Sequence, residues 1–169
     1  MNGNGKAAMV VVLMGVTGVG KTTVGKRLAN GLGWAFYDAD DFHPDTNVEK
    51  MHKGIALKDE DRMPWLKALN ALIGESLERG ESAVLACSAL RETYRRMLKE
   101  GHDRVVFVYL SASPEVVRER LEHRVGHFMN PDLLASQFET LEAPADAVVV
   151  DAEGSPREVV REIREKLGV

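Results

Sequence analysis

The amino-acid sequence predicts an α/β fold in which a five-stranded, mainly parallel sheet lies between two layers of helices. Two observations support this class. Short apolar runs rich in β-branched residues alternate with segments whose apolar residues recur at helical spacing. The first run, at 9–14 (MVVVLM), leads directly into a glycine-rich loop and then into a helical pattern. Strands that alternate with helices are joined by right-handed crossovers, which place helices over the sheet.

Each expected element has its own signal. Continuous apolar runs are typical of strands buried inside a parallel sheet, and they occur at 9–14, 34–37, 82–87, 105–110 and 147–150. Helical spacing predicts helices after the glycine-rich loop, near 47–53, from about 61–64 onward, and at 91–99, 114–124 and 131–141. The sequence Ser155-Pro156-Arg157-Glu158 is a capping box with proline in the first turn, so it predicts the start of the last helix.

The composition fits one domain over 1–169, with residues 1–7 expected to be disordered. The chain has 169 residues and 44% hydrophobic content, enough for one full-sized core. Its net charge of −4 argues against general nucleic-acid binding. A single cysteine, Cys87, excludes an intramolecular disulfide, and no apolar stretch approaches the roughly 18 residues of a membrane span. We expect a soluble, cytoplasmic protein with no nucleic-acid or membrane partner.

The loop at 15–22 (GVTGVGKT) matches the phosphate-binding pattern G-x-x-x-x-G-K-[ST]. In this pattern backbone N–H groups wrap an anion, the lysine reaches the β- and γ-phosphates, and the last hydroxyl binds Mg²⁺. The loop follows a strand and precedes a helix, a context that disfavours a chance glycine-rich turn. We therefore expect ATP and Mg²⁺ here, with Thr22 as a metal ligand and with ATP contacts from Gly15, Val16, Thr17, Gly18, Val19, Gly20, Lys21, Thr22 and Thr23.

An acidic segment follows the second expected strand. Asp38 and Asp40 come just past 34–37, where a parallel sheet presents ligands beyond its carboxyl ends. In an extended backbone both side chains point to the same side. A solvated acidic turn is the alternative, but phosphoryl transfer needs groups that organise the metal and orient the acceptor. Beside a phosphate loop the functional interpretation is preferred.

Several blocks of the sequence resemble gluconate kinases. They are Asp38-Ala39-Asp40-Asp41-Phe42-His43-Pro44, Asp61-Arg62, Pro64-Trp65-Leu66, Cys87-Ser88-Ala89-Leu90, Tyr94-Arg95, Gly126-His127-Phe128 and Ser136-Gln137-Phe138-Glu139-Thr140-Leu141. The resemblance implies a three-layer P-loop fold like that of shikimate and nucleoside-monophosphate kinases, and often a homodimer. It also implies phosphorylation of D-gluconate by ATP at the terminal hydroxyl. Asp40 would then be the acceptor-orienting base, and Asp38 would lie in the outer coordination sphere of Mg²⁺.

A gluconate pocket needs cations and neutral hydrogen-bonding groups. Residues of these types that should converge on the ligand edge of the sheet are His43, Lys53, Arg62, Ser88, Arg91 and Arg95. Arg62 is suited to bind the carboxylate in a bidentate way, because its guanidinium is a planar fork. Alternatives remain. Arg62 could pair with Asp59 or Asp61, His43 could bond within its own turn, and the two arginines at 91 and 95 could form a solvated basic face.

A basic helix suggests a lid at about 118–132. Arg120 and Arg124 lie one turn apart and match lid arginines that close over ATP in the resembling kinases, where they act in catalysis; a solvated basic helix is the alternative. The resemblance adds Arg124, His127 and Gln137 to the substrate contacts, and it places adenine near the loop 151–156. Two other functions stay open: a sibling kinase acting on shikimate or another polyol acid, and a nucleotide-binding module without chemistry.

Overall fold

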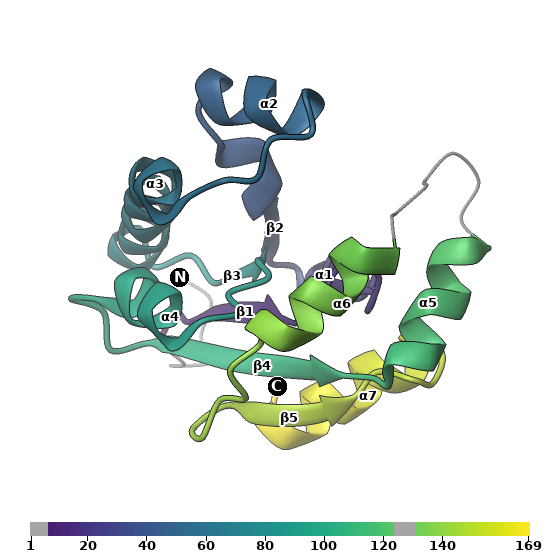
Figure 1. The fold of residues 1–169 in the computed structure, drawn as a ribbon. Helices are drawn as coiled ribbons and strands as arrows, with labels where there is room; N and C mark the ends of the chain where they lie inside the picture. The colour runs from purple at the N-terminus through teal and green to yellow at the C-terminus, as the bar shows by residue number, and fades with distance from the viewer. Residues whose placement is uncertain (1–6, 124–130) are drawn as a thin grey trace.

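A computed structural model of the chain describes residues 7–123 and 131–169. Its centre is one five-stranded sheet in the order β2-β3-β1-β4-β5 (Figure 1). The strands are β1 Val10–Met14, β2 Ala35–Asp38, β3 Ala83–Ala86, β4 Val105–Ser111 and β5 Val148–Asp151. All four neighbouring pairs are parallel, so the predicted parallel five-stranded sheet is confirmed. β1 lies in the middle, and the loop that follows it opens at the centre of the carboxyl edge.

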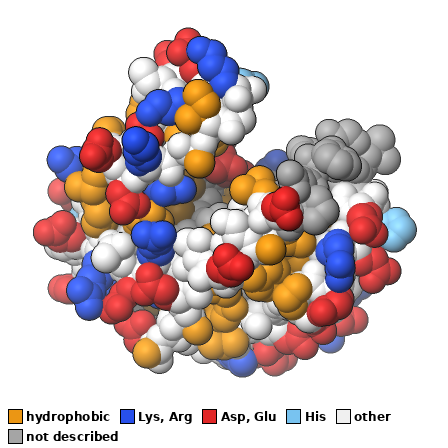
Figure 2. Space-filling model, viewed as in Figure 1, with side chains coloured by type: hydrophobic (Ala, Val, Ile, Leu, Met, Phe, Trp, Pro, Cys, Tyr) orange, Lys and Arg blue, Asp and Glu red, His pale blue; other side chains and the backbone are white. Residues whose placement is uncertain are grey.

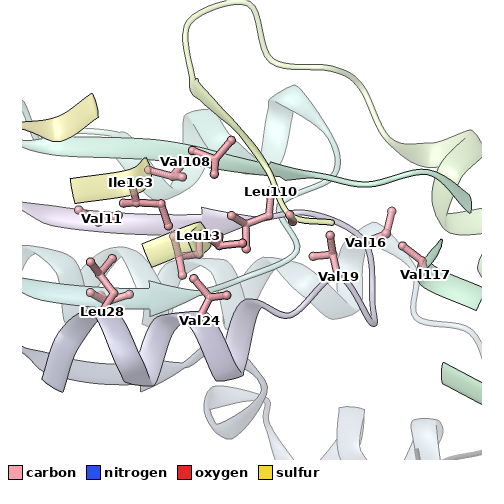
Figure 3. Close-up of a cluster of buried hydrophobic side chains, with 14 of the residues drawn as sticks. Val11, Leu13, Val16, Val19, Val24, Leu28, Val108, Leu110, Val117 and Ile163 are labelled. Carbon is pink, nitrogen blue, oxygen red and sulfur yellow. The ribbon is translucent and has the colours of Figure 1, made fainter. Parts of the chain in front are cut away.

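Helices cover both faces of the sheet (Figure 1). They are α1 Lys21–Leu32, α2 Asp45–His52, α3 Asp59–Glu78, α4 Glu92–Lys99, α5 Pro114–Glu122, α6 Pro131–Thr140 and α7 Pro156–Leu167. The side chains of β1 alternate between two cores, as the pleat of a strand requires. Val11 and Leu13 join the core formed with α1 and α7 (Figure 3), whereas Val12 and Met14 join the core formed with α3.

Most expected helices form within a residue or two of their predicted bounds, with two exceptions. The long helix begins at Asp59, earlier than predicted, because Asp61 Oδ2 accepts a hydrogen bond from the Lys58 backbone N–H at 2.9 Å. A short 3₁₀ helix, Ala39–Phe42, stands where an extended backbone was expected. The predicted cap of α7 is present, since Ser155 Oγ accepts from the Glu158 N–H.

The arrangement leaves the carboxyl edge of the sheet between two sets of helices. α2 stands above β2 and faces α6 across a gap in the ribbon (Figure 1), and the space-filling view shows a hollow between these two parts of the surface (Figure 2). Basic side chains line the side of the hollow that carries α2 and α3 (Figure 2). In the described ranges, 7–123 and 131–169, no helix has the length and apolar character needed to cross a bilayer.

Candidate active site

The phosphate loop connects β1 to α1, as predicted. Lys21 lies across this loop, and its Nζ donates to the carbonyl oxygens of Gly15 at 2.8 Å and Val16 at 2.9 Å. Gly15 has a φ of +149°, and a Cβ there would come within 2.9 Å of the Leu110 carbonyl oxygen. A side chain at this position would therefore push β4 away from the loop. The sequence pattern thus has a direct steric reason in the fold.

Gln137 on α6 binds the phosphate loop, although it was predicted to bind the acceptor. Its Oε1 accepts from the Thr17 N–H at 2.6 Å, and its Nε2 donates to Thr17 Oγ1 at 2.8 Å. Both polar atoms of the amide are thus engaged with one residue of the loop. The contact joins residues 120 positions apart, so nothing in the local sequence pattern points to it. It connects the helix after the predicted lid to the phosphate site.

Asp38 ends β2, and Asp40 lies in the 3₁₀ helix that follows, which corrects the prediction that one extended segment carries both aspartates. Asp38 caps the 3₁₀ helix, and its Oδ1 accepts from the Asp40 N–H at 3.0 Å. The other oxygen of Asp38 accepts from the Thr22 hydroxyl at 3.1 Å. Asp38 therefore ties Thr22, the predicted Mg²⁺ ligand, to the turn that carries Asp40. Sequence spacing could not reveal this, because it does not distinguish a strand end from one 3₁₀ turn.

The Asp40 carboxyl has an environment suited to proton transfer. Burial raises its pKa above the ordinary value for aspartate, and the neighbouring Asp38 carboxylate raises it further. His43 and Lys21 act in the opposite direction, because positive charge near the carboxylate favours its ionised form. Asp40 thus lies within electrostatic range of both the phosphate-loop lysine and His43. Perturbed carboxyl groups in such positions are candidates for general bases.

His43 is fixed against Trp65 and Asn47. Its ring stacks on the indole at 4.2 Å between centroids with an interplanar angle of 13°. Asn47 Nδ2 lies 3.2 Å from His43 Nδ1 and also donates to the Asp61 carbonyl oxygen at 2.8 Å. Burial lowers the pKa of His43, and nearby Arg62 lowers it too, against the opposing effect of Asp40. The imidazole is therefore held neutral at pH 7, with Nδ1 accepting and the proton on Nε2.

Trp65 is a core residue with a polar contact. Its indole Nε1 donates to the buried carbonyl of Ala39 at 2.7 Å, which attaches α3 to the 3₁₀ helix. The stacking that holds His43 was not predicted, because the sequence pattern shows only that position 65 faces the core.

Arg62, near the start of α3, is close enough to His43 to lower the pKa of the imidazole. Its Nη1 donates to the Tyr94 hydroxyl at 3.1 Å and lies 3.7 Å from Asp59 Oδ1. Of the two pairings considered from the sequence, the one with Asp59 is present, while Asp61 instead pairs with Lys50 at 2.7 Å. Arg91 approaches the same group, with Nη1 3.9 Å from Asp59 Oδ2.

Arg95 lies outside this arrangement, contrary to the prediction that it binds the substrate. It is 6% exposed, and its guanidinium donates to the carbonyl oxygens of Ala89 at 2.7 Å and Glu142 at 2.9 Å. The alternative of a solvated basic face shared with Arg91 is also wrong, because Arg91 precedes α4 as its cap and Arg95 is buried. Arg95 instead fixes the turn that follows β3.

The remaining predicted residues fall into three situations. Ser88 is half-buried, and its carbonyl oxygen accepts from the Gly15 N–H at 3.2 Å, so its turn lies against the phosphate loop. Lys53 is exposed at the end of α2. Arg124 and His127 fall in 124–130, the part of the predicted lid that lies outside the described residues.

Arg120 bridges the phosphate loop and the loop after β5. Its guanidinium donates to the carbonyl oxygens of Val19 at 3.1 Å and Gly154 at 3.4 Å. Beside it is a pocket of about 200 Å³ lined by Gly18, Val19, Gly20, Thr23, Val24, Arg120, Leu121, Ala152, Gly154, Pro156 and Val159. Its apolar wall suits a flat aromatic base next to the phosphate loop. The sequence interpretation had included the loop 151–156 but not the wall supplied by α5 and α7.

The fold and this site define a P-loop kinase that acts on a small acceptor. Residues 17–168 match the family model described as shikimate kinase, which implies the use of ATP. A gluconokinase from Gluconobacter oxydans is 44% identical over 156 residues, covering 90% of this chain and 88% of that protein. A probable gluconokinase from Mus musculus is 41% identical over 182 residues, covering 96% and 99%.

Comparison with solved structures points to the same family and fold. The crystal structure of a gluconokinase from Sinorhizobium meliloti is similar with a TM-score of 0.84 at 42% identity, covering 96% of this chain and 93% of that one. A shikimate kinase from Bacteroides thetaiotaomicron is similar with a TM-score of 0.69 at 19% identity, covering 95% and 99%, which shows the shared fold. The chain belongs to the gluconokinase family of P-loop kinases.

Proposed function

We propose that the protein transfers the γ-phosphoryl group of ATP to the terminal hydroxyl of D-gluconate, giving 6-phospho-D-gluconate. The observation that carries the proposal is the hydrogen-bonded link from Thr22 through the Asp38 carboxylate to the Asp40 N–H, which fixes Asp40 beside the phosphate loop. Asp40 is within electrostatic range of Lys21 and His43, and His43 is within range of Asp40 and Arg62. A base beside the phosphate loop and a separate arginine for the carboxylate fit an acid whose reacting hydroxyl is at the end opposite its carboxylate.

The donor side is formed by the phosphate loop and its neighbours. The loop N–H groups and Lys21 bind the phosphates, and Arg120 lies beside the pocket suited to the base. The Thr22 hydroxyl and the Asp38 carboxylate, 3.1 Å apart, are oxygen ligands of the type that Mg²⁺ prefers, so these residues fit the ion. When bound, Mg²⁺ neutralises charge on the phosphates. Asp38 would contact it through water, which is common for this ion.

Asp40 performs the proton transfer in this proposal. Its carboxylate accepts the proton of the terminal hydroxyl as the hydroxyl oxygen bonds to the γ-phosphorus, and ADP leaves with the electrons of the broken P–O bond. The raised pKa brings the carboxyl closer to working pH and so makes it a better base than an exposed aspartate.

Arg62 and His43 recognise the acceptor. Arg62 binds the carboxylate, and the neutral His43 offers its Nε2–H to a hydroxyl between the two ends. Ser88, beside the phosphate loop, is a further candidate for a hydroxyl contact. Arg91 and Lys53 stay predictions for this side, as do Arg124 and His127, the cytoplasmic location and the homodimer.

An assay of ADP release tests the proposal, with gluconate, shikimate, glycerate, AMP and glucose as acceptors. We expect turnover with gluconate at a kcat/KM at least tenfold above every other acceptor. Efficient turnover of a different acid, with none of gluconate, would favour the sibling-kinase alternative. Nucleotide binding without turnover of any acceptor would favour a module without chemistry.

A further inference from the structure

Four side chains contact one another near the starts of α3 and α4, and we call this group, Asp59, Arg62, Arg91 and Tyr94, the arginine cluster. Asp59 and Arg62 come from the first turn of α3, and the other two come from the start of α4. The Asp59 carboxylate faces both guanidinium groups, at 3.7 Å and 3.9 Å. The chain therefore already presents a carboxylate to the two arginines that are candidates for binding the acceptor's own carboxylate.

Tyr94 organises the cluster. Its hydroxyl donates to Asp59 Oδ1 at 2.6 Å and accepts from Arg62 Nη1 at 3.1 Å. Because the phenolic proton is directed at Asp59, an oxygen lone pair remains for Arg62. Both guanidinium groups also lie over the Tyr94 ring, at 5.6 Å for Arg62 and 6.0 Å for Arg91. Tyr94 is thus a positioning residue for Arg62.

The contacts of Asp59 are of a kind that a ligand can replace. Its side chain is 66% exposed, and neither arginine is within hydrogen-bonding distance of it. Exposed ion pairs of this type are weak and exchange with solvent. In contrast, the neighbouring Asp61 is closely paired with Lys50 and caps α3, so it is not free to exchange partners. Asp59 is therefore the carboxylate that competes with a ligand for the arginines.

We infer that Asp59 determines the charge specificity of the acceptor site by competing with the acceptor's carboxylate for Arg62 and Arg91. It reduces the charge that the two arginines present from two to one, which matches an acid with a single carboxylate. The same competition weakens the hold on the product, which keeps that carboxylate and gains a phosphate. The inference rests on the proposed function for the identity of the acid, but the competition itself is a property of the cluster.

The test compares Asp59→Asn with Glu60→Gln. The asparagine keeps an oxygen that can accept from Tyr94 and removes only the charge. Glu60 is an exposed acid on the same helical turn, so Glu60→Gln makes the same change in net charge outside the cluster. KM for gluconate, Ki for 6-phosphogluconate and Ki for the neutral analogue D-glucitol are measured for both variants and for the unchanged protein.

We expect Asp59→Asn to lower the KM for gluconate and the Ki for 6-phosphogluconate by about two- to fivefold, the range of an exposed ion pair. The Ki for D-glucitol should not change, Glu60→Gln should have no effect, and added salt should reduce the difference. A rise in the KM for gluconate would mean that Asp59 supports the arginines, and it would overturn the inference. So would an equal change for D-glucitol or an equal effect of Glu60→Gln.

Tyr94→Phe tests the positioning role separately. It should raise the KM for gluconate without changing the KM for ATP, and an unchanged KM for gluconate would contradict the role. Absence of gluconate turnover by the unchanged protein counts against the proposed function. If another carboxylic acid is turned over instead, the competition by Asp59 is tested by comparing the KM for that acid between Asp59→Asn and the unchanged protein.

Discussion

Replacing Arg95 by methionine should destabilise the protein strongly and leave acceptor recognition largely intact. The guanidinium makes two short hydrogen bonds to backbone carbonyls while almost fully buried, and hydrogen bonds to charged groups contribute about 1.5–3 kcal/mol each. Methionine keeps most of the apolar stem and removes the cost of burying a charge, so we expect a net loss of about 3–5 kcal/mol. For a chain of this size that is a fall of roughly 6–20 °C in Tm.

The backbone conformation of Ala89, whose carbonyl oxygen accepts a hydrogen bond from Arg95, adds to this expectation. Among the described residues, Ala89 is the one non-glycine residue with a positive φ, +44°, a conformation that costs about 1–2 kcal/mol. Arg95 binds the carbonyl of this residue and so holds the strained turn in place. Ala89→Gly should consequently recover about 1 kcal/mol in the Arg95→Met background.

Urea denaturation and steady-state kinetics together decide this prediction. Arg96→Met is the matched control, because Arg96 is on the same helix but is exposed and forms a surface ion pair with Glu92. It should change the free energy of unfolding by no more than about 0.5 kcal/mol. If Arg95→Met instead costs less than about 1 kcal/mol and raises the KM for gluconate selectively, Arg95 is an acceptor ligand and the structural assignment is wrong.

Three further substitutions probe the site. Asp40→Asn should lower kcat by about 10²–10⁴-fold, the usual contribution of a general base. It should also raise the free energy of unfolding at neutral pH, because burial and Asp38 raise the pKa of the Asp40 carboxyl and so penalise its charged form; in urea titrations this gain should disappear as the pH falls below the ordinary aspartate range. Trp65→Phe should cost about 1–3 kcal/mol in urea denaturation, since it leaves the buried Ala39 carbonyl without its donor, and an unchanged midpoint would contradict that. Gln137→Leu should weaken ATP binding in a fluorescent-nucleotide titration by releasing Thr17, whereas a selective rise in the KM for gluconate would restore its predicted acceptor role.

Much of the fold was predictable because its signals are local. The apolar runs and the phosphate pattern identify five strands and the first loop without knowledge of the rest of the chain, although the edge strands β2 and β5 are only partly buried. The strand order was not predicted, since the sequence does not show which strands are neighbours. The 3₁₀ turn at Ala39–Phe42 was missed for a related reason: its determinant is the capping of one N–H by Asp38, and a D-x-D segment is also compatible with an extended chain.

The sequence indicated which types of side chain the site needs, but it did not show which partners each side chain contacts. Lys21, Thr22 and Asp38 lie together as their motifs indicate. Arg95 and Gln137 have suitable side chains for a polar substrate, but the fold uses them to hold backbone at long sequence separation. A single sequence does not separate these uses, because both require the same donor groups.

The position of the phosphate on the product tests the central claim most directly. In the proposed function, Asp40 is the base at one end of the acceptor, held beside the phosphate loop through Asp38, and Arg62 binds the carboxylate at the other end. We therefore predict that ³¹P and ¹H NMR of the product formed from ATP and D-gluconate will show phosphorus coupled to the two protons of C6, giving 6-phospho-D-gluconate. Phosphate on a secondary hydroxyl, or release of inorganic phosphate without any sugar phosphate, would contradict this account.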